Sequence, residues 1–333
     1  MPATIFDVAK LAGVSISTVS RVLNGRDRVH PQTRQRVQDA IRKLDYEQTA
    51  PARTLATRRS EMLGLVIPQV NDPFFYQIVR GVEDATSAAG YSLLIASQPR
   101  HEGIPRNLKP FRRRFVDGLV VVAIDVAIEE VQELLDRGVP LVLVQMTMGE
   151  QVPAFTVDNY GGARILVEHL LSVHGYRRFA YIAGSNYTPD NAERLCALQN
   201  TLDEHDLALP SAYVVEGDYL RGSGYEAMQH LLTLDERPDV VFAANDQMAT
   251  DAMLALRAHN VSVPEDIAVV GFDDVHFASY VTPPLTTVHQ PSYELGFQAA
   301  QVTLQAAQYE KPVEPVQTVL PTRLVVRQSC GCA

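Results

Sequence analysis

Residues near the start of the chain combine the side chains that read DNA on one face of a short helix. Ile16, Ser17, Ser20 and Arg21 have helical spacing. Serine hydroxyls bond to phosphates or base edges, and a guanidinium can donate two parallel hydrogen bonds to guanine. Ser15 and the amides at the start of such a helix suit phosphate oxygens. This combination favours DNA contact in the major groove. The alternative is a small three-helix bundle whose Ser/Arg face is only solvated.

A second group of polar and aromatic residues follows apolar runs farther along the chain. Aromatic faces stack on the C–H face of a sugar or on a purine. Carboxylates and amides accept hydrogen bonds from neighbouring hydroxyls, and arginine donates to them. The alternatives are helix caps for Asp246 and Asp274, core packing for either ring, and a surface position for Arg194. The group consists of Asn71, Asp72, Phe74, Phe75, Arg194, Asn245, Asp246, Asp273 and Asp274.

The DNA-facing residues need a helical scaffold, and residues 1–46 predict one. Thr4 is a good N-cap for a helix over 5–12, Asp7 adds a negative charge to its first turn, and Gly13 ends it. A second helix over 15–23 places Val19 in the angle between the two helices. A third helix is expected over 31–44. The pattern predicts a helix-turn-helix headpiece.

The distribution of charge supports this assignment. The 333-residue chain has a net charge of -10, which by itself argues against nucleic-acid binding. Residues 1–60, however, hold 11 Lys and Arg against 5 Asp and Glu, a net charge of +6, which leaves -16 on the remainder. A basic segment attached to an acidic body is typical of a DNA-binding module joined to another kind of domain.

The second group needs parallel sheets, and the chain beyond residue 60 alternates apolar runs with amphipathic segments. Such βα repeats predict parallel sheets covered on both faces, with ligands at the carboxyl ends of the strands. Helices are expected over 78–89 and 161–173. Strands are expected over 63–67, 91–96, 118–123, 141–144, 178–183, 240–243, 267–271 and 286–288.

These motifs resemble the lac-repressor (LacI/GalR) family of transcriptional regulators. The resemblance begins in the run from Thr4 to Asn24 and continues through 29–46. It extends through Phe242-Ala243-Ala244-Asn245-Asp246, Val270-Gly271-Phe272-Asp273-Asp274 and Pro284-Leu285-Thr286. The body is also similar to periplasmic sugar-binding proteins. The resemblance therefore implies an all-α headpiece followed by a two-lobed α/β effector domain with doubly wound parallel sheets.

For the DNA end, the resemblance implies that Ile16, Ser17 and Arg21 read bases. It implies a hinge over 47–60 in which Leu55 wedges into the minor groove and kinks the DNA. Gln48-Thr49 stands where the family usually has Pro-Asn, and His30 where it usually has a better N-cap. The full set of residues expected at the DNA is Thr4, Ser15, Ile16, Ser17, Ser20, Arg21, Asn24 and Leu55.

For the body, the resemblance implies a homodimer and a ligand between two lobes. The N-terminal lobe would comprise 61–158 plus 290–320, and the C-terminal lobe 159–289 plus 321–333, with crossings near Asp158, Gln290 and Pro321. A mono- or disaccharide is the expected effector, and a purine is the alternative. The expected contacts are Asp72, Phe74, Phe75, Gln145, Arg194, Tyr219, Asn245, Asp273 and Gln290.

Other features weigh against competing functions. The start of the chain lacks a secretory pattern and no apolar run suggests a membrane span, so a periplasmic uptake protein is disfavoured and a cytoplasmic protein expected. No phosphate loop, dinucleotide fingerprint or nucleophile elbow favours an enzyme, and no cofactor is expected. The basic stretch 100–114 is interpreted as solvated rather than as a second DNA patch. Cys330 and Cys332 lack evident partner ligands in sequence, so no metal site is expected.

Overall fold

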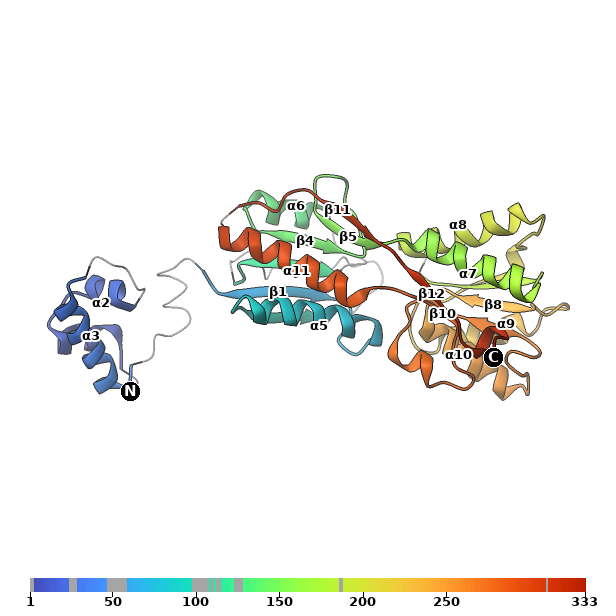
Figure 1. The fold of residues 1–333 in the computed structure, drawn as a ribbon, viewed down its shortest axis with the longest axis horizontal. Helices are drawn as coiled ribbons and strands as arrows, with labels where there is room; N and C mark the ends of the chain where they lie inside the picture. The colour runs from blue at the N-terminus through green and yellow to red at the C-terminus, as the bar shows by residue number, and fades with distance from the viewer. Residues whose placement is uncertain are drawn as a thin grey trace.

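The three helices of the headpiece have the bounds that the sequence pattern predicts to within one residue. The computed structural model describes residues 3–23, 29–46, 59–97, 108, 111, 115–122, 128–185, 188–309 and 311–333. The headpiece helices are α1 (Ile5–Ala12), α2 (Ile16–Leu23) and α3 (Pro31–Leu44) (Figure 1). Val8, Val19 and Val37 are fully buried, one from each helix, and form the centre of its small core.

Hydrogen bonds organise the start of α1 and the corner between α1 and α2. The amide of Thr4 donates to Asp7 Oδ2 at 2.9 Å, and the Thr4 hydroxyl accepts from the Asp7 amide at 3.4 Å, which completes a capping box. Gly13 ends α1 with φ of 63°, where a side chain would be strained. Arg36 Nη2 donates to the carbonyls of Ala12 and Gly13 and so ties α3 to this corner.

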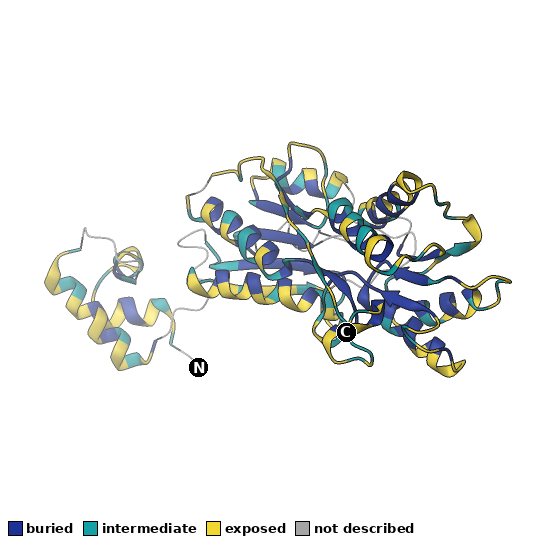
Figure 2. Ribbon diagram, turned by 45° about the vertical axis from the view of Figure 1, so that its right-hand side comes forward, coloured by how far each residue is buried: buried dark blue, intermediate teal, exposed yellow. Residues whose placement is uncertain are grey.

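The first lobe contains a six-stranded sheet with the order β11-β5-β4-β3-β1-β2. Every paired neighbour in it is parallel. The central strands are buried on both faces, as Figure 2 shows in dark blue. Its strands are β1 (Met62–Ile67), β2 (Ser92–Ser97), β3 (Gly118–Val122), β4 (Leu141–Val144), β5 (Ala154–Val157) and β11 (Gln317–Leu320).

Helices cover both faces of this sheet. On one face, α5 (Pro73–Ala88) and α11 (Ser292–Tyr309) pack on a core that contains Leu63 and Leu65. On the other face, α6 (Ile128–Asp136) packs on Val66 and its neighbours.

Two glycines bring α5 and α11 into direct backbone contact. A Cβ added at Gly81 would lie 2.1 Å from the carbonyl oxygen of Tyr293. A Cβ added at Gly296 would lie 2.2 Å from the carbonyl oxygen of Ile78. Neither position has room for a methyl group. The two helices therefore interlock at two points, with one glycine contributed by each helix.

The second lobe has a four-stranded parallel sheet with the order β7-β6-β8-β9, and a separate antiparallel pair of β10 and β12. Tyr181, Phe179, Phe242 and Phe272 are the largest fully buried side chains of its core. Its strands are β6 (Phe179–Ala183), β7 (Val214–Glu216), β8 (Val240–Ala243), β9 (Ala268–Val270), β10 (Thr287–His289) and β12 (Arg323–Val325). Its helices are α7 (Asn159–His174), α8 (Pro189–Glu204), α9 (Ser223–Leu231) and α10 (Asp246–Ala258), with short 3-10 turns η2 (Ser211–Tyr213), η3 (His276–Ser279) and η4 (Gln328–Cys330).

The chain passes between the two sheets three times. It leaves the first sheet after β5, returns between β10 and α11, and leaves again between β11 and β12 (Figure 1). The result is the two-lobed fold of type I periplasmic binding proteins behind a helix-turn-helix headpiece. Among the described helices, none is both long enough and apolar enough to cross a membrane.

Some elements differ from the sequence prediction. Helix α5 begins at Pro73 rather than at residue 78, because Asp72 caps it by accepting a hydrogen bond from the Phe74 amide at 2.9 Å. The strands β5, β7, β11 and β12 were not predicted. β7, β11 and β12 contain exposed or half-buried residues, so they do not form the continuous apolar run that marks a buried strand.

Candidate functional site

The outer face of α2 presents the polar residues singled out in the sequence. Ser15, Ser17 and Arg21 are exposed, and 39% of Ile16 is exposed. Ser20 is half-buried. Because Val19 and Val22 lie in the headpiece core, the opposite face of the helix is fixed in the protein. The helix can therefore present one side to a ligand without losing its packing.

The start of α2 is organised by Ser15. Its hydroxyl accepts from the Thr18 amide at 3.2 Å and shares a hydrogen bond with the Ser17 hydroxyl at 2.8 Å. Thr4, also expected at DNA, is exposed but engaged with Asp7 in the capping box. Asn24 and Leu55 lie outside the described residues, as does the hinge except for Arg59 and Ser60.

In the body, a chain of side-chain hydrogen bonds joins segments from both lobes. Gln145, directly after β4 of the first sheet, donates from Nε2 to Gln290 Oε1 at 2.8 Å. Gln290, in the crossing after β10, donates from Nε2 to Asp273 Oδ1 at 2.6 Å. Asp273 follows β9 of the second sheet. We call these three residues the inter-lobe network.

Arg194 lies in the second lobe with only 3% of its surface exposed, so its interpretation as a surface charge is wrong. Its Nε and Nη2 donate to Asn159 Oδ1 at 3.0 and 2.9 Å, and its Nη1 donates to the Ala244 carbonyl at 2.5 Å. The guanidinium carbon lies 3.9 Å from the centroid of the Phe272 ring. These contacts compensate the cost of burying a cation.

Tyr219 and Asn245 are held beside this arginine. Tyr219 Oη donates to Asp190 Oδ2 at 2.6 Å, and the same carboxylate oxygen lies 3.7 Å from Arg194 Nη2. Asn245 caps α10 by accepting from the Met248 amide at 2.9 Å, and its Nδ2 donates to the Tyr219 carbonyl at 3.2 Å. We call Arg194 and its partners Asn159, Asp190 and Phe272 the arginine cluster. Tyr219 therefore connects this cluster to the start of α10.

Asp273 is the electrostatic centre of the set. Burial raises its pKa well above the usual range, the positive charge of Arg194 opposes that shift, and the charges of Asp246 and Asp72 add to it. Only 8% of Asp273 is exposed. Asp72 of the first lobe and Arg194 of the second lobe both affect the pKa of this carboxyl, so charged side chains of both lobes lie near it.

Phe74 and Phe75 differ in their burial. Phe75 is buried in the first lobe's core, which agrees with the core alternative for that ring. Phe74 is half-buried and meets Phe75 edge-on, with centroids 5.1 Å apart. Phe74 is therefore the ring of the pair with surface left to offer a ligand.

The whole chain matches known proteins. Residues 4–48 match the model of bacterial regulatory proteins of the lacI family, and residues 167–330 match a periplasmic binding protein-like domain. The regulator CelR of Thermobifida fusca is 39% identical over 339 residues, covering 98% of each chain, and the repressor PurR of Actinobacillus pleuropneumoniae is 32% identical over 330 residues, also covering 98% of each. The chain belongs to the LacI family.

Solved structures of LacI-family relatives have the same fold along the full chain. A complex of CelR with cellobiose superposes with a TM-score of 0.73 at 35% identity, covering 98% of this chain and 99% of that one. A lac repressor dimer bound to operator and an anti-inducer has a TM-score of 0.81 at 27% identity, covering 99% of each chain. The relatives are transcriptional regulators and repressors.

Within this LacI-family chain, several carboxylates are explained by structure rather than by a ligand. Asn245, not Asp246, caps α10. Asp246 is fully buried and accepts from the Thr287 hydroxyl at 2.5 Å and the Val275 amide at 2.9 Å. Asp274 pairs with Arg327 at 2.6 Å and with His289 at 2.9 Å. The helix-cap interpretation is therefore wrong for both aspartates, which instead tie loops of the second lobe together.

Three residues of the expected ligand set have a positive backbone φ. Positive φ values are uncommon for residues other than glycine and collect at functional sites. Gln145 has φ of 63°, Tyr219 of 70° and Asp273 of 127°. Two of these residues belong to the inter-lobe network, and Tyr219 contacts the arginine cluster.

Sequence reasoning missed Asn159, Asp190 and Phe272 as partners of Arg194. A signal existed for Asp190, because it precedes Arg194 by four residues on one helix, the spacing of a side-chain pair. Sequence reasoning also found no ligands near Cys330 and Cys332, yet the structure places His169 and His174 beside them. Much of the basic stretch 100–114 lies outside the described residues.

Proposed function

We propose that this chain is a homodimeric, sequence-specific repressor whose affinity for operator DNA is controlled by a small saccharide bound between its two lobes. In this proposal residues 1–46 bind DNA, 47–60 form the hinge, and the body binds the effector. The first lobe comprises 61–158 plus 290–320, and the second comprises 159–289 plus 321–333.

The observation that carries the proposal is the inter-lobe network. Gln145 and Asp273 follow strands of different sheets, and Gln290 lies in a crossing between them. A ligand that exchanges hydrogen bonds with these amides and this carboxyl would change the relative free energies of the lobe arrangements. Such unequal binding to two states is what allosteric control requires. Multiple acceptors and donors of this kind suit sugar hydroxyls, and the relative CelR has been solved with cellobiose.

Dimerisation is supported by the edge of the first sheet. β2 lies at the end of the strand order, and Leu94 and Ile95 on it are 36% and 40% exposed. Apolar side chains on an edge strand favour burial against another chain. The relative lac repressor is a dimer on its operator, and two headpieces can read half-sites about one helical turn apart.

The test combines ligand screening with DNA binding. The full chain is screened by thermal shift against mono- and disaccharides, with operator DNA selected from a random pool. The expected result is one saccharide that raises Tm and changes operator affinity at the same concentration. Selection of no preferred sequence would contradict the DNA part, whereas a ligand that raises Tm without altering DNA affinity would contradict the control. Recovery of the sugar as another compound would contradict a non-enzymatic role.

The second candidate effector is a purine. It is favoured by the partly exposed ring of Phe74, because an aromatic face stacks on a purine base. Purine bases and nucleosides therefore belong in the same thermal-shift panel. A purine that changes operator affinity while no saccharide does so would replace the saccharide in the proposal and leave the rest intact.

A further inference from the structure

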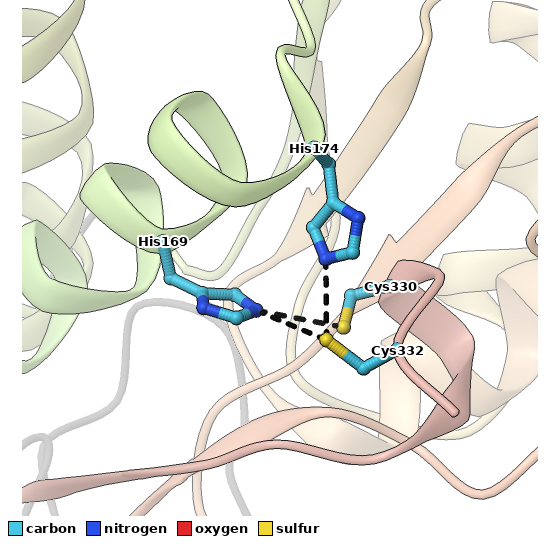
Figure 3. A group of neighbouring side chains, drawn as sticks. All are labelled: His169, His174, Cys330 and Cys332. Atoms are coloured by element: carbon cyan, nitrogen blue, oxygen red, sulfur yellow. Dashed lines mark hydrogen bonds between the residues drawn. The ribbon is translucent and has the colours of Figure 1, made fainter.

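Two histidines and two cysteines converge where α7 ends. His169 and His174 come from the last turns of α7, and Cys330 and Cys332 come from the final residues of the chain, about 160 positions later (Figure 3). Each offers one ligand atom, and the four atoms lie within 4.8 Å of one another. Figure 3 shows the imidazole nitrogens and both sulfurs pointing into the same small space.

The separations of these atoms fit a tetrahedron around one metal ion. His169 Nε2 lies 3.8 Å from Cys330 Sγ and 3.7 Å from Cys332 Sγ, and His174 Nε2 lies 3.4 Å from Cys332 Sγ. Zinc bonds of about 2.3 Å to sulfur and about 2.0 Å to nitrogen, at tetrahedral angles, place S and N about 3.6 Å apart. The three measured distances scatter around that value.

We propose that His169, His174, Cys330 and Cys332 form a structural zinc site. Two thiolates and two imidazoles are the donor set that Zn²⁺ prefers, and four protein ligands leave no open position for a substrate. The H-x4-H spacing falls within the usual range for zinc ligands on a helix.

The surrounding residues hold the ligands in position. The carbonyl of Cys330 accepts from Tyr176 Oη at 3.0 Å, and its sulfur accepts from the Thr286 hydroxyl at 3.1 Å. The Tyr176 ring stacks on His174 with centroids 5.4 Å apart. Such outer contacts fix the orientation of metal ligands.

The glycine between the cysteines is required by the geometry. Gly331 has φ of 102°, and a Cβ on it would lie 3.2 Å from His174 Nδ1 and 3.3 Å from Tyr176 Oη. Its left-handed conformation lets the chain turn so that both sulfurs face α7. The glycine of this C-G-C sequence therefore allows both cysteines to face the two histidines.

The site would fasten the chain end to the second lobe. α7 has 16 residues and is about 24 Å long, and its other end carries Asn159, which binds Arg194. The ion would thus lie at the opposite end of α7 from Asn159 and Arg194. Its expected effect is on the stability of the second lobe rather than on direct contact with an effector.

The experiment measures metal in the full, tag-free chain purified under reducing conditions. Mass spectrometry of metals should find one zinc per chain. Replacement by Co²⁺ should give the visible absorption of a tetrahedral ion together with sulfur-to-cobalt charge transfer. Cys332→Ser and His174→Ala should each lower zinc affinity by at least about 100-fold. Cys196→Ser, which removes the exposed cysteine of α8, should retain one zinc and the same cobalt spectrum.

A stability measurement keeps the test independent of variant folding. A strong chelator should lower the Tm of the wild-type chain by about 5 °C or more, and added zinc should restore it. The proposal is overturned if the reduced wild-type chain holds no stoichiometric zinc, if its cobalt spectrum persists in Cys332→Ser, or if Cys330 and Cys332 are found as a disulfide in the chain purified under reducing conditions. None of these results depends on the ligand or the DNA in the proposed function.

Discussion

The candidate DNA contacts and the inter-lobe network are assembled in opposite ways. On α2 the exposed residues share one eight-residue helix, and the core on its other side is made within the headpiece. In the body, Gln145 and Gln290 are 145 positions apart and meet Asp273 from a third segment. The first set lies on the surface, whereas Gln290 and Asp273 are buried.

This difference implies separable functions. A side chain on the outer face of α2 can change without disturbing the body's hydrogen bonds, and the network can change without altering the surface of α2. A variant in one region should therefore affect one of the two binding activities. A variant that changes both binding activities would show that the two regions are coupled.

The largest expected effect is that of Arg21→Ala on DNA binding. Loss of a guanidinium–base contact costs about 1–3 kcal/mol, and a dimer loses two, so specific affinity should fall about 100-fold or more. Fluorescence anisotropy with selected operator measures it, while calorimetry should show unchanged effector affinity. Arg257→Ala removes an exposed cation of α10 and should leave both intact. Loss of effector binding in Arg21→Ala would contradict the separation.

Asp273→Ala should have the next largest effect, on the effector. Removing a buried carboxyl that accepts from Gln290 leaves that amide and the ligand without a partner, which should weaken effector binding about 30-fold or more. Operator affinity without effector should remain close to wild type. Calorimetry and anisotropy measure the two quantities. Asp235→Ala, an exposed aspartate, is the matched control, and an unaltered response in Asp273→Ala would refute this site.

The buried Asp246 predicts a pH dependence of stability. Burial raises its pKa to about 7, while the unfolded chain releases this proton near its ordinary pKa of about 4. The folded state thus holds more protons between these values, so its contribution makes the free energy of unfolding fall as pH rises toward 7 and then level off. Asp246→Asn resembles the protonated acid and should remove about 2 kcal/mol of the decrease between pH 5 and 7.

Denaturant titrations of the wild type and the variant at several pH values measure this slope. Asp136→Asn, in an exposed position of α6, should retain the wild-type slope. An identical slope in Asp246→Asn would mean that Asp246 is charged in the folded protein throughout this range.

The smallest expected effect is that of Gln145→Asn. Asparagine tolerates the left-handed backbone at this position but is too short to reach Gln290. A net hydrogen bond is worth about 1 kcal/mol, so the effector concentration at half response should change about fivefold. Gln132→Asn, at an exposed position of α6, should cause no change. An unchanged effector concentration at half response would contradict a role for Gln145 in the response.

The headpiece was predictable because its determinants are local. The capping box of Thr4 and Asp7, the left-handed Gly13 and the buried Val19 are all properties of spacing within twenty residues. The central strands were predictable for a similar reason, since a strand buried on both faces is a continuous apolar run.

The remaining features depend on tertiary contacts that no short window contains. β11 pairs with β5 although the two are about 160 residues apart, and its alternating exposure gives a weak signal. No pattern in the sequence around Arg194 indicates that it contacts Asn159 and Phe272. His169 lies near Cys330 only because η4 returns to α7 after both lobes are complete.

The interlocked glycines of α5 and α11 limit how the lobes can move. With Gly81 against Tyr293 and Gly296 against Ile78, sliding one helix along the other would drive carbonyl groups into neighbouring backbone. The close contact therefore opposes shear between α5 and α11. Because α11 begins two residues after Gln290, we expect a reorientation of the lobes to take place in the crossing segments while α5 and α11 move together. Replacing either glycine by alanine would force α5 and α11 apart and distort their packing.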